Sequence, residues 1–299
     1  MWIVAGRMST PRLEHDAPQT TSRSLANSIR ATRSHPRAYM LFASFLQPLA
    51  SIPFIRQNYS MAWRCSGGSN EQLIENLWRS GLITDPRAKE AFLKVDRAHY
   101  APHSPYEDSP QYIGHEATIS APHMHAMAIE NLLHYLTPSA ASPAPRVLDI
   151  GSGSGYLTHL LAELVGEKGL VVGLEHIPAL RQIGEENMRK STEGMKLLDS
   201  GKVKFRVGDG RLGLKEPVRR GEEAHGTDWD VIHVGASARE LHQALLDQLK
   251  APGCMFIPID DDASGVMQSV WRISKDKEGK VHKKNICGVR YVKLTDPPI

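Results

Sequence analysis

Cysteine is scarce in this chain, and its spacing excludes two kinds of stabilising site. The 299 residues include three cysteines, Cys65, Cys254 and Cys287, which lie far apart and form no Cys-x-x-Cys pair. This pattern argues against a zinc cluster and against a disulfide framework, and it fits a reducing compartment. We therefore expect a cytoplasmic protein without a metal site.

Long apolar segments are missing as well. An uncharged run from Tyr39 to Ile55 is interrupted by Pro48 and Pro53 and is short for a bilayer crossing. Hydrophobic residues make up 41% of the chain and charged residues 23%, which is the balance of an ordinary globular domain. We expect a folded core and no association with a membrane.

Lysine is absent from residues 1–60, which hold seven arginines and only two acidic residues, Glu14 and Asp16. An Arg-rich, acid-poor start is typical of organelle transit peptides, so this segment is either a disordered extension or a mitochondrial targeting signal. The net charge of the whole chain is only +3. Nucleic acid is therefore not an expected partner. We predict a single folded domain over 61–299.

Hydrophobic periodicity after Ser69 predicts a regular succession of elements. Helices are expected at 69–78, 85–95 and 121–136, from the glycines near 155 to 165, and at 178–190 and 238–250, with an irregular stretch at 101–115. Strands are expected at 146–151, 170–175, 203–209, 230–236, 254–259, 266–273 and 288–294. Strands that alternate with helices predict an α/β fold with a parallel sheet, helices on both faces and a C-terminal antiparallel hairpin.

The segment 147–157, "VLDIGSGSGYL", has the form of a strand, a glycine turn and a helix. Gly151 and Gly153 permit a tight turn and a close approach to a ligand, and Gly155 is expected to let the helix pack against the strand. Glu175 ends the next predicted strand, where a carboxylate can accept hydrogen bonds from both hydroxyls of a ribose. These features predict a site for a nucleoside-containing cofactor.

Two details favour S-adenosylmethionine over a dinucleotide. Asp149 stands just before the glycines, where a carboxylate would repel a pyrophosphate but suit a cationic group. The spacing Gly-x-Gly-x-Gly also differs from the dinucleotide pattern Gly-x-Gly-x-x-Gly. Asp209 and Gly210 end the third predicted strand, where an adenine amino group would need an acceptor.

The segment 117–126, "ATISAPHMHA", contains no charged side chain. On a helix that begins at Ala121, the stripe facing the core is His125, Ile129, Leu132 and Leu136. His123 falls on the opposite side, as a solvated or rim residue, so a metal shared by the two histidines is not expected. His125 is either a core histidine or part of the ligand crevice. Ser120 either caps the helix or places its hydroxyl beside a substrate.

Six segments together resemble the protein-L-isoaspartate O-methyltransferase family. They are "DSPQYIG" (108–114), "ATISAPHMHA" (117–126), "LDIGSGSGYLT" (148–158), "VGDGR" (207–211), "IHVGA" (232–236) and "ALLDQLK" (244–250). The resemblance covers about 61–296, and "MAWRCSGGS" from Met61 is similar to the start of such proteins. It implies a Rossmann-like methyltransferase sheet with extra N-terminal helices. The implied reaction is protein repair: a methyl group passes from S-adenosylmethionine to the free α-carboxyl of L-isoaspartyl, and also D-aspartyl, residues in damaged proteins.

The resemblance also implies roles for individual positions. Ala117, Thr118, Ile119 and His125 are expected to bind the substrate, with Ser120 as the catalytic residue. The expected cofactor residues are Asp149, Gly151, Gly153, Ser154, Gly155, Glu175, Asp209, Gly210 and Thr295. Glu175 stands where the family often has aspartate, which is chemically equivalent but one methylene shorter. The expected partners are isoaspartyl proteins and peptides, and the expected state is a monomer.

Other classes of protein fit the residues less well. Methyltransferases that act on base amino groups have an Asn/Asp-Pro-Pro-aromatic run after the fourth strand, where this chain has "HVGAS" (233–237). Cytosine-C5 enzymes use a Pro-Cys nucleophile, and no cysteine here follows a proline. A nucleotide-binding module without enzymatic activity would leave the segment 117–126 unexplained.

Overall fold

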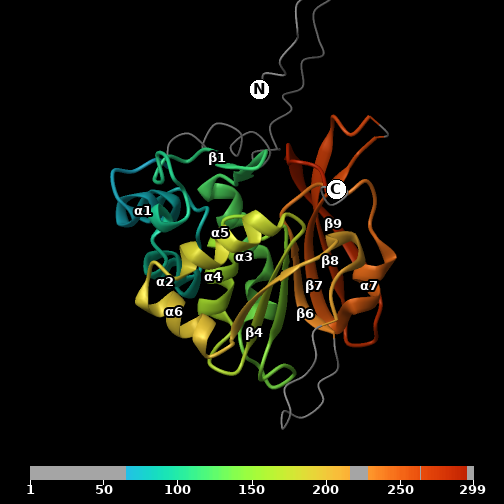
Figure 1. Ribbon diagram of the computed structural model, residues 1–299. Helices are drawn as coiled ribbons and strands as arrows, with labels where there is room; N and C mark the ends of the chain where they lie inside the picture. Colours follow the sequence, from blue (N-terminus) through green and yellow to red (C-terminus); the bar gives the residue numbers. More distant parts are fainter. Residues whose placement is uncertain (1–64, 216–227, 263, 295–299) are drawn as a thin grey trace, which may run out of the picture. The chain divides into compact units, whose positions relative to one another are not determined.

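A seven-stranded sheet organises the part of the chain that the computed structural model describes, which is residues 65–215, 228–262 and 264–294. Its strand order is β5-β4-β3-β6-β7-β8-β9 (Figure 1). The strands are β3 (Arg146–Ile150), β4 (Leu170–Glu175), β5 (Val203–Val207), β6 (Trp229–Val234), β7 (Leu249–Asp260), β8 (Gln268–Lys275) and β9 (Val281–Val289). Strands β3 to β7 run parallel, whereas β8 and β9 are antiparallel to their neighbours. The predicted parallel sheet with a C-terminal antiparallel hairpin is confirmed.

Helices cover the two faces of the sheet unequally. One face packs against α3 (Pro122–Leu136), α4 (Tyr156–Leu164), α5 (Pro178–Met188) and α6 (Thr192–Asp199), and α1 (Asn70–Arg79) and α2 (Pro86–Lys94) extend the same core by packing on these helices. The other face packs against α7 (Gln243–Gln248). Side chains alternate between the two cores along each strand, so Val147 lies in the first core and Leu148 in the second. Helices on both faces were predicted, and this is confirmed.

The two N-terminal helices begin as their sequences predict. The Ser69 hydroxyl accepts from the Gln72 amide at 3.3 Å, and the Gln72 side chain accepts in return from the Gly68 amide at 2.6 Å. Asp85 caps the second helix by accepting from the Arg87 amide at 2.9 Å, with Pro86 in the first turn. Both caps satisfy amides that would otherwise lack a partner at a helix start.

A short hairpin lies where the sequence predicts irregular structure. Strand β1 (Gln111–Gly114) pairs antiparallel with β2 (Ala117–Ile119). The turn residues His115 and Glu116 have φ angles of 52° and 56°. The prediction missed this hairpin because its strands are too short to show alternation and its turn lacks the Asn-Gly or Asp-Gly signal of such turns.

Three further elements differ from their predicted bounds. Helix α6 was not predicted, although Ser191 caps it by accepting from the Gly194 amide at 3.0 Å. The last strand is Val281–Val289 rather than 288–294, because an exposed, lysine-rich edge strand resembles a loop in sequence. Helix α7 is shorter than predicted, because Leu249 already begins the long strand β7. Among the described residues, no helix has both the length and the apolar character that a membrane crossing needs.

Candidate active site at the carboxyl ends of the parallel strands

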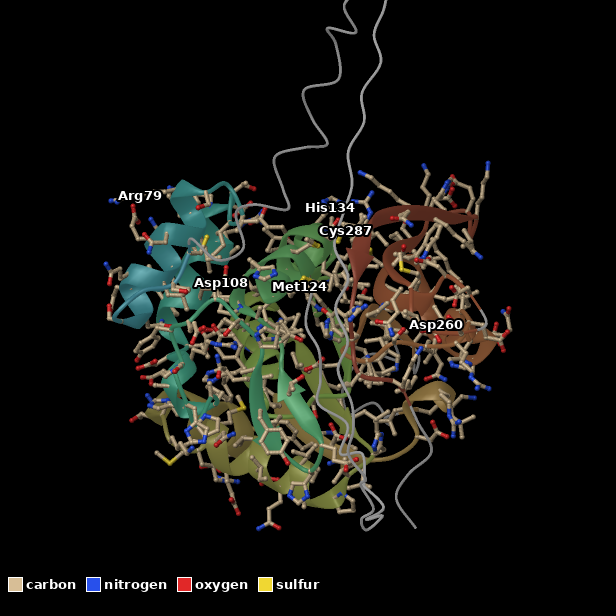
Figure 2. The ribbon with its side chains drawn as sticks, turned by 90° about the horizontal axis from the view of Figure 1, so that it is seen from above. Arg79, Asp108, Met124, His134, Asp260 and Cys287 are labelled. Atoms are coloured by element: carbon tan, nitrogen blue, oxygen red, sulfur yellow. The ribbon has the colours of Figure 1, made fainter. Side chains whose placement is uncertain are left out.

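A cavity of about 260 Å³ opens at the carboxyl ends of β3 and β4. The strand order reverses between β3 and β6, and in parallel sheets ligands bind at such a reversal. The cavity brings together six of the predicted site residues, namely Ala117, Thr118, Gly151, Gly153, Glu175 and Gly210. Figure 2 looks down on the molecule, with Asp108 on the side of the N-terminal helices and Asp260 on the side of the C-terminal strands.

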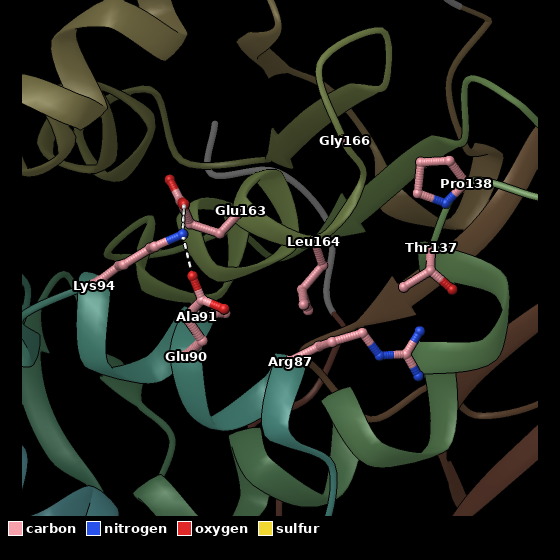
Figure 3. A pocket seen from close by; sticks show the side chains of 9 residues that line it. All are labelled: Arg87, Glu90, Ala91, Lys94, Thr137, Pro138, Glu163, Leu164 and Gly166. Carbon is pink, nitrogen blue, oxygen red and sulfur yellow. Dashed lines mark ion pairs between the residues drawn. The ribbon is translucent and has the colours of Figure 1, made fainter.

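A second hollow, of about 350 Å³, contains none of the predicted site residues (Figure 3). It lies between α2 and the end of α4, and its lining includes Pro138 and Gly166, which precede β3 and β4 along the chain. It therefore belongs to the amino ends of the strands, opposite the 260 Å³ cavity. Its main charges already pair, since Lys94 lies 2.8 Å from Glu90 and 3.8 Å from Glu163.

The glycine turn has the geometry that only glycine adopts at low cost. Gly151 and Gly153 have φ angles of 73° and 50°. The turn is bonded to the end of β4, because the Gly151 amide donates to the Leu174 carbonyl at 2.8 Å and the Gly153 amide donates to Glu175 Oε2 at 3.0 Å. Main-chain atoms of the turn can therefore approach a ligand closely.

Gly155 performs a different packing function from the one predicted. A Cβ atom on Gly155, whose φ is 83°, would lie 2.8 Å from the carbonyl oxygen of Gly184 in α5. The close approach is thus between the start of α4 and helix α5, and not between α4 and its strand. The prediction was wrong because the strand and helix adjacent in sequence gave no sign of the third element.

Glu175 is held rigidly at the cavity wall. It is 4% exposed, and three main-chain amides donate to its carboxylate, from Gly153 at 3.0 Å, His176 at 2.8 Å and Ile177 at 3.1 Å. A carboxylate has about four lone-pair sites, so about one is left for a ligand donor. This geometry suits a strong bond to one hydroxyl better than the predicted pair of equal bonds.

Asp149 lies outside the cavity lining, beneath the glycine turn. It is 1% exposed, and its two oxygens accept from the Thr158 hydroxyl at 2.6 Å and meet His233 Nδ1 at 2.8 Å. The strand alternation directs it toward α4 together with Val147. Asp149 thus ties β3 to α4 and β6, and it does not face the space where a cationic group was expected.

Asp209 and Ser154 also lie behind the cavity wall. Hydrogen bonds from Arg211 lower the pKa of Asp209, whose carboxylate accepts from the Arg211 amide at 2.9 Å and from its guanidinium at 2.7 Å. The Ser154 side chain accepts from the Tyr156 amide at 3.4 Å. Gly210 does line the cavity, and a Cβ there would lie 2.3 Å from Ile150 Cγ2. Thr295 lies outside the described residues.

Ser120 does not cap the helix that follows it. Helix α3 has Ala121 at its N-cap and no side-chain capping bond, so the capping alternative was wrong. The Ser120 carbonyl instead accepts from Arg97 Nη2 at 2.7 Å. Burial raises the pKa of Tyr291, and a hydrogen bond with the Ser120 side chain opposes that rise. Ser120 is therefore held from two sides.

His125 faces the core, as the stripe predicts. Its ring lies 5.2 Å from the ring of Tyr156, and its Nδ1 lies 3.3 Å from Arg97 Nη1. Burial, followed by the nearby Arg97 charge, lowers the pKa of His125 well below its usual value, so the ring is neutral at physiological pH. Ile119, at the end of β2, is also buried and does not line the cavity.

His123 is the rim residue of the two predicted alternatives, solvated or rim. Its side chain is 21% exposed, and both its amide and its Nδ1 meet Asp108 Oδ1, at 2.9 and 2.8 Å. This pair ties the first turn of α3 to the segment before the hairpin. Across the described residues, no group of three His, Cys, Asp or Glu side chains is arranged to hold a metal ion.

The segment 292–294 closes one side of the cavity, directly before Thr295, which the family resemblance assigns to the cofactor. Val292, Lys293 and Leu294 line the cavity. The Ser237 amide donates to the Val292 carbonyl at 2.7 Å, and Lys293 Nζ lies 2.7 Å from both oxygens of Asp260. The apolar pattern predicted a strand over 288–294, whereas the strand ends at Val289 and residues 292–294 lie over the cavity.

Comparison with known proteins identifies the family. The profile of the family described as protein-L-isoaspartate(D-aspartate) O-methyltransferase matches residues 68–298. This chain belongs to that family. The family's reaction is S-adenosylmethionine-dependent methylation of isoaspartyl residues, which makes the protein a repair enzyme.

Individual members of the family are similar over most of their length. A Caenorhabditis elegans protein-L-isoaspartate O-methyltransferase is 42% identical over 236 residues, which cover 79% of this chain and 96% of that one. A Triticum aestivum relative with the same name is 41% identical over 228 residues, or 76% of this chain and 91% of that one. A Plasmodium falciparum structure described as this enzyme in complex with S-adenosyl-L-homocysteine has a TM-score of 0.66 and 35% identity. That match covers 77% of this chain and 99% of the solved one.

Proposed function

We propose that the 260 Å³ cavity is the site of methyl transfer, divided into a cofactor side and a substrate side. The cofactor side consists of Gly151, Gly153, Glu175 and Gly210. The substrate side consists of Ala117 and Thr118, which line the cavity, and of Ile119, Ser120 and His125, which lie behind them outside the lining. The observation that carries this proposal is that Glu175 and the pair Ala117 and Thr118 line one cavity at the reversal of strand order.

On the cofactor side, S-adenosylmethionine fits the residues present. Glu175 is oriented by three amides and retains an acceptor position for a ribose hydroxyl. Gly210 packs so closely against Ile150 that any side chain would collide with it, so the main chain itself forms this part of the cavity wall. The family resemblance assigns Asp209 to the adenine amino group, which would share the carboxylate with Arg211, and assigns a further contact to Thr295, outside the described residues. Asp149, Ser154 and Gly155 support this side through the start of α4.

The substrate side has to hold an acceptor that is already reactive. The α-carboxyl of an isoaspartyl residue is ionised at neutral pH, so no base is needed to activate it. The cofactor supplies a methyl group already activated by a positively charged sulfur. Ser120 hydrogen-bonds the acceptor carboxylate and aligns one oxygen for direct displacement. A bond from that oxygen to the methyl carbon forms as the carbon–sulfur bond breaks, with no covalent enzyme intermediate.

The absence of charge in residues 117–126 suits this task. A lysine in this segment would neutralise the attacking carboxylate, and an aspartate or glutamate would compete for the methyl group. His125 does not introduce charge either, because burial and Arg97 keep it neutral. The substrate carboxylate is thus the one nucleophile presented to the methyl group in this segment.

Paired peptides test the proposed function. A peptide with one L-isoaspartyl residue and its L-aspartyl twin are incubated with the protein and labelled S-adenosylmethionine. We expect a methyl ester on the isoaspartyl peptide alone. Equal labelling of the twins, or none on either, would refute the proposal. A third peptide with a D-aspartyl residue measures whether the activity extends to that isomer.

We also propose that residues 1–60 are dispensable for catalysis and that the enzyme is a monomer of cytoplasmic or, if the extension is a targeting signal, mitochondrial location. The extension lies outside the described residues. A protein that starts at Met61 is expected to keep its turnover and its melting temperature. A large loss of either would show that the extension packs on the methyltransferase domain.

A further inference from the structure

Arg97 is a fully buried cation beside the substrate side of the cavity. It opens the short helix η2 (Arg97–His99), and its side chain is 0% exposed. Within the described ranges no carboxylate forms an ion pair with it. Burial lowers the pKa of Arg97 to about 10, so the guanidinium remains charged at neutral pH.

Such a group does not favour folding by itself. A buried charge without a paired countercharge is costly, and apolar side chains of similar volume are often more stabilising. The contacts of Arg97 indicate what offsets this cost. Nη2 donates to the Ser120 carbonyl at 2.7 Å, and Nη1 lies 3.3 Å from His125 Nδ1. Both contacted residues belong to the substrate side.

The guanidinium also connects the substrate side to the glycine turn. Its central carbon lies 5.1 Å from the ring centre of Tyr156, the first residue of α4. The backbone of Arg97 is itself anchored, because its amide donates to Asn70 Oδ1 at 3.4 Å and Asn70 Nδ2 donates to the Phe92 carbonyl at 3.0 Å. A planar guanidinium with several fixed donors can satisfy these neighbours at once, which a lysine ammonium cannot.

We propose that Arg97 is a positioning residue that fixes the main chain at Ser120 and thereby aims the Ser120 hydroxyl at the acceptor carboxylate. Arg97 holds Ser120 from the side of the N-terminal helices, and Tyr291 meets its side chain from the side of the C-terminal segment. Arg97 itself touches neither substrate nor cofactor. This inference rests on the proposed role of Ser120 in methyl transfer.

The variant Arg97→Lys tests the inference, because it keeps the charge and loses the planar fork. We expect its kcat on an isoaspartyl peptide to fall about 30- to 100-fold, the scale expected when reacting groups are misplaced by about 1 Å. Its Kd for S-adenosylhomocysteine should stay within about twofold of the wild-type value, because the cofactor side is unchanged. Arg97→Gln, which is uncharged and too short to reach the Ser120 carbonyl, serves in its place if Arg97→Lys does not fold, and should lose at least as much activity.

Combining Arg97→Lys with Ser120→Ala in a double-mutant cycle distinguishes a positioning role of Arg97 from a purely structural one. Ser120→Ala should lower kcat strongly in the wild-type background and by less than about twofold in the Arg97→Lys background, because both changes remove the same alignment. Arg146→Lys is the matched control. Arg146 is also buried, and its guanidinium carbon also lies 5.1 Å from an aromatic ring centre, that of Trp229, but it stands at the amino end of β3, whereas the cavity lies at the carboxyl end.

The Arg146→Lys control is expected to lose stability and keep its kcat. Independent, multiplying losses from Arg97→Lys and Ser120→Ala would overturn the inference. So would an equal loss of S-adenosylhomocysteine affinity, or a fall in kcat in the Arg146 control as large as that in Arg97→Lys. If the wild-type protein fails to methylate the isoaspartyl peptide, the proposed function fails first, and the inference fails with it.

Discussion

The two sides of the cavity are held in place by different kinds of interaction. On the cofactor side, main-chain bonds between neighbouring strands fix the position of the glycine turn, as when the Gly235 amide donates to the Ile150 carbonyl at 2.7 Å. On the substrate side, residues 117–119 pair with β1 in a two-stranded hairpin separate from the main sheet, and individual side chains, those of Arg97, Asp108 and Tyr291, hold Ser120 and the start of α3.

This difference predicts how each side responds to substitution. The ladder of the main sheet uses main-chain groups, so a single substitution on the cofactor side removes a ligand contact and nearby bonds, such as that from the Gly153 amide to Glu175, while the sheet keeps its arrangement. Each side-chain contact on the substrate side can be removed by a single substitution, so a change there alters the alignment of the acceptor carboxylate. The two sides should therefore fail in different measurements, binding for one and turnover for the other.

The largest effect is expected for Ser120→Ala. Loss of the hydroxyl that aligns the acceptor should lower turnover on an isoaspartyl peptide by up to about a hundredfold. The free energy of unfolding should fall by only about 1 kcal/mol, because Ser120 makes no capping bond and its side chain loses one hydrogen bond, to Tyr291. Initial rates and urea unfolding measure both quantities. Unchanged turnover would remove Ser120 from the substrate side.

Glu175→Ala should have a somewhat smaller effect, and on binding. Loss of one hydrogen bond to a charged group should weaken cofactor binding by about 2 kcal/mol, or about thirtyfold. Glu175→Asp should lose less, since it keeps the carboxylate. Calorimetric titration with S-adenosylhomocysteine measures the change. Equal affinity in Glu175→Ala and wild type would contradict the assignment of Glu175 to the cofactor side.

Gly155→Ala tests the frame that both sides share. A side chain at a φ of 83° is strained, and its Cβ would lie 2.8 Å from the Gly184 carbonyl. We expect the free energy of unfolding to fall by about 1.5 kcal/mol. Because α4 carries Tyr156 as well as the glycine turn, turnover and cofactor affinity should fall together. A stability equal to that of wild type would show that α4 and α5 can separate without cost.

The smallest effect concerns pH. The pKa of His125 in the folded chain is well below its usual value of about 6.5, so on acidification the unfolded chain binds a proton at His125 before the folded chain does. The free energy of unfolding is therefore unaffected by this proton above pH 6.5 and falls as the pH drops below that value. Between pH 7 and pH 5.5 the loss should be about 1 kcal/mol. His125→Gln should remove that part of the slope in urea unfolding, and an identical slope would show that His125 titrates normally.

Sequence patterns predicted the cofactor side better than the substrate side. Gly151, Gly153 and Glu175 could be predicted because a strand followed by a glycine turn is a local signal within consecutive residues. Arg97 and Tyr291 could not, because nothing near them in sequence shows that they meet at Ser120. Asp149 was expected to face the cofactor because alternation along a five-residue strand does not reveal which face adjoins the ligand. The hairpin β1–β2 was missed for its brevity, and the edge strand β9 for its lysines.

Amide hydrogen exchange tests the division of the cavity most directly. The wild-type protein is measured alone, with S-adenosylhomocysteine, and with S-adenosylhomocysteine plus an isoaspartyl peptide. We expect S-adenosylhomocysteine to slow exchange at 151–155, 175–177 and 208–210, and the peptide then to slow exchange at 117–120. Protection by the peptide elsewhere, for example around the hollow that contains Arg87 and Lys94, with none at 117–120, would contradict it.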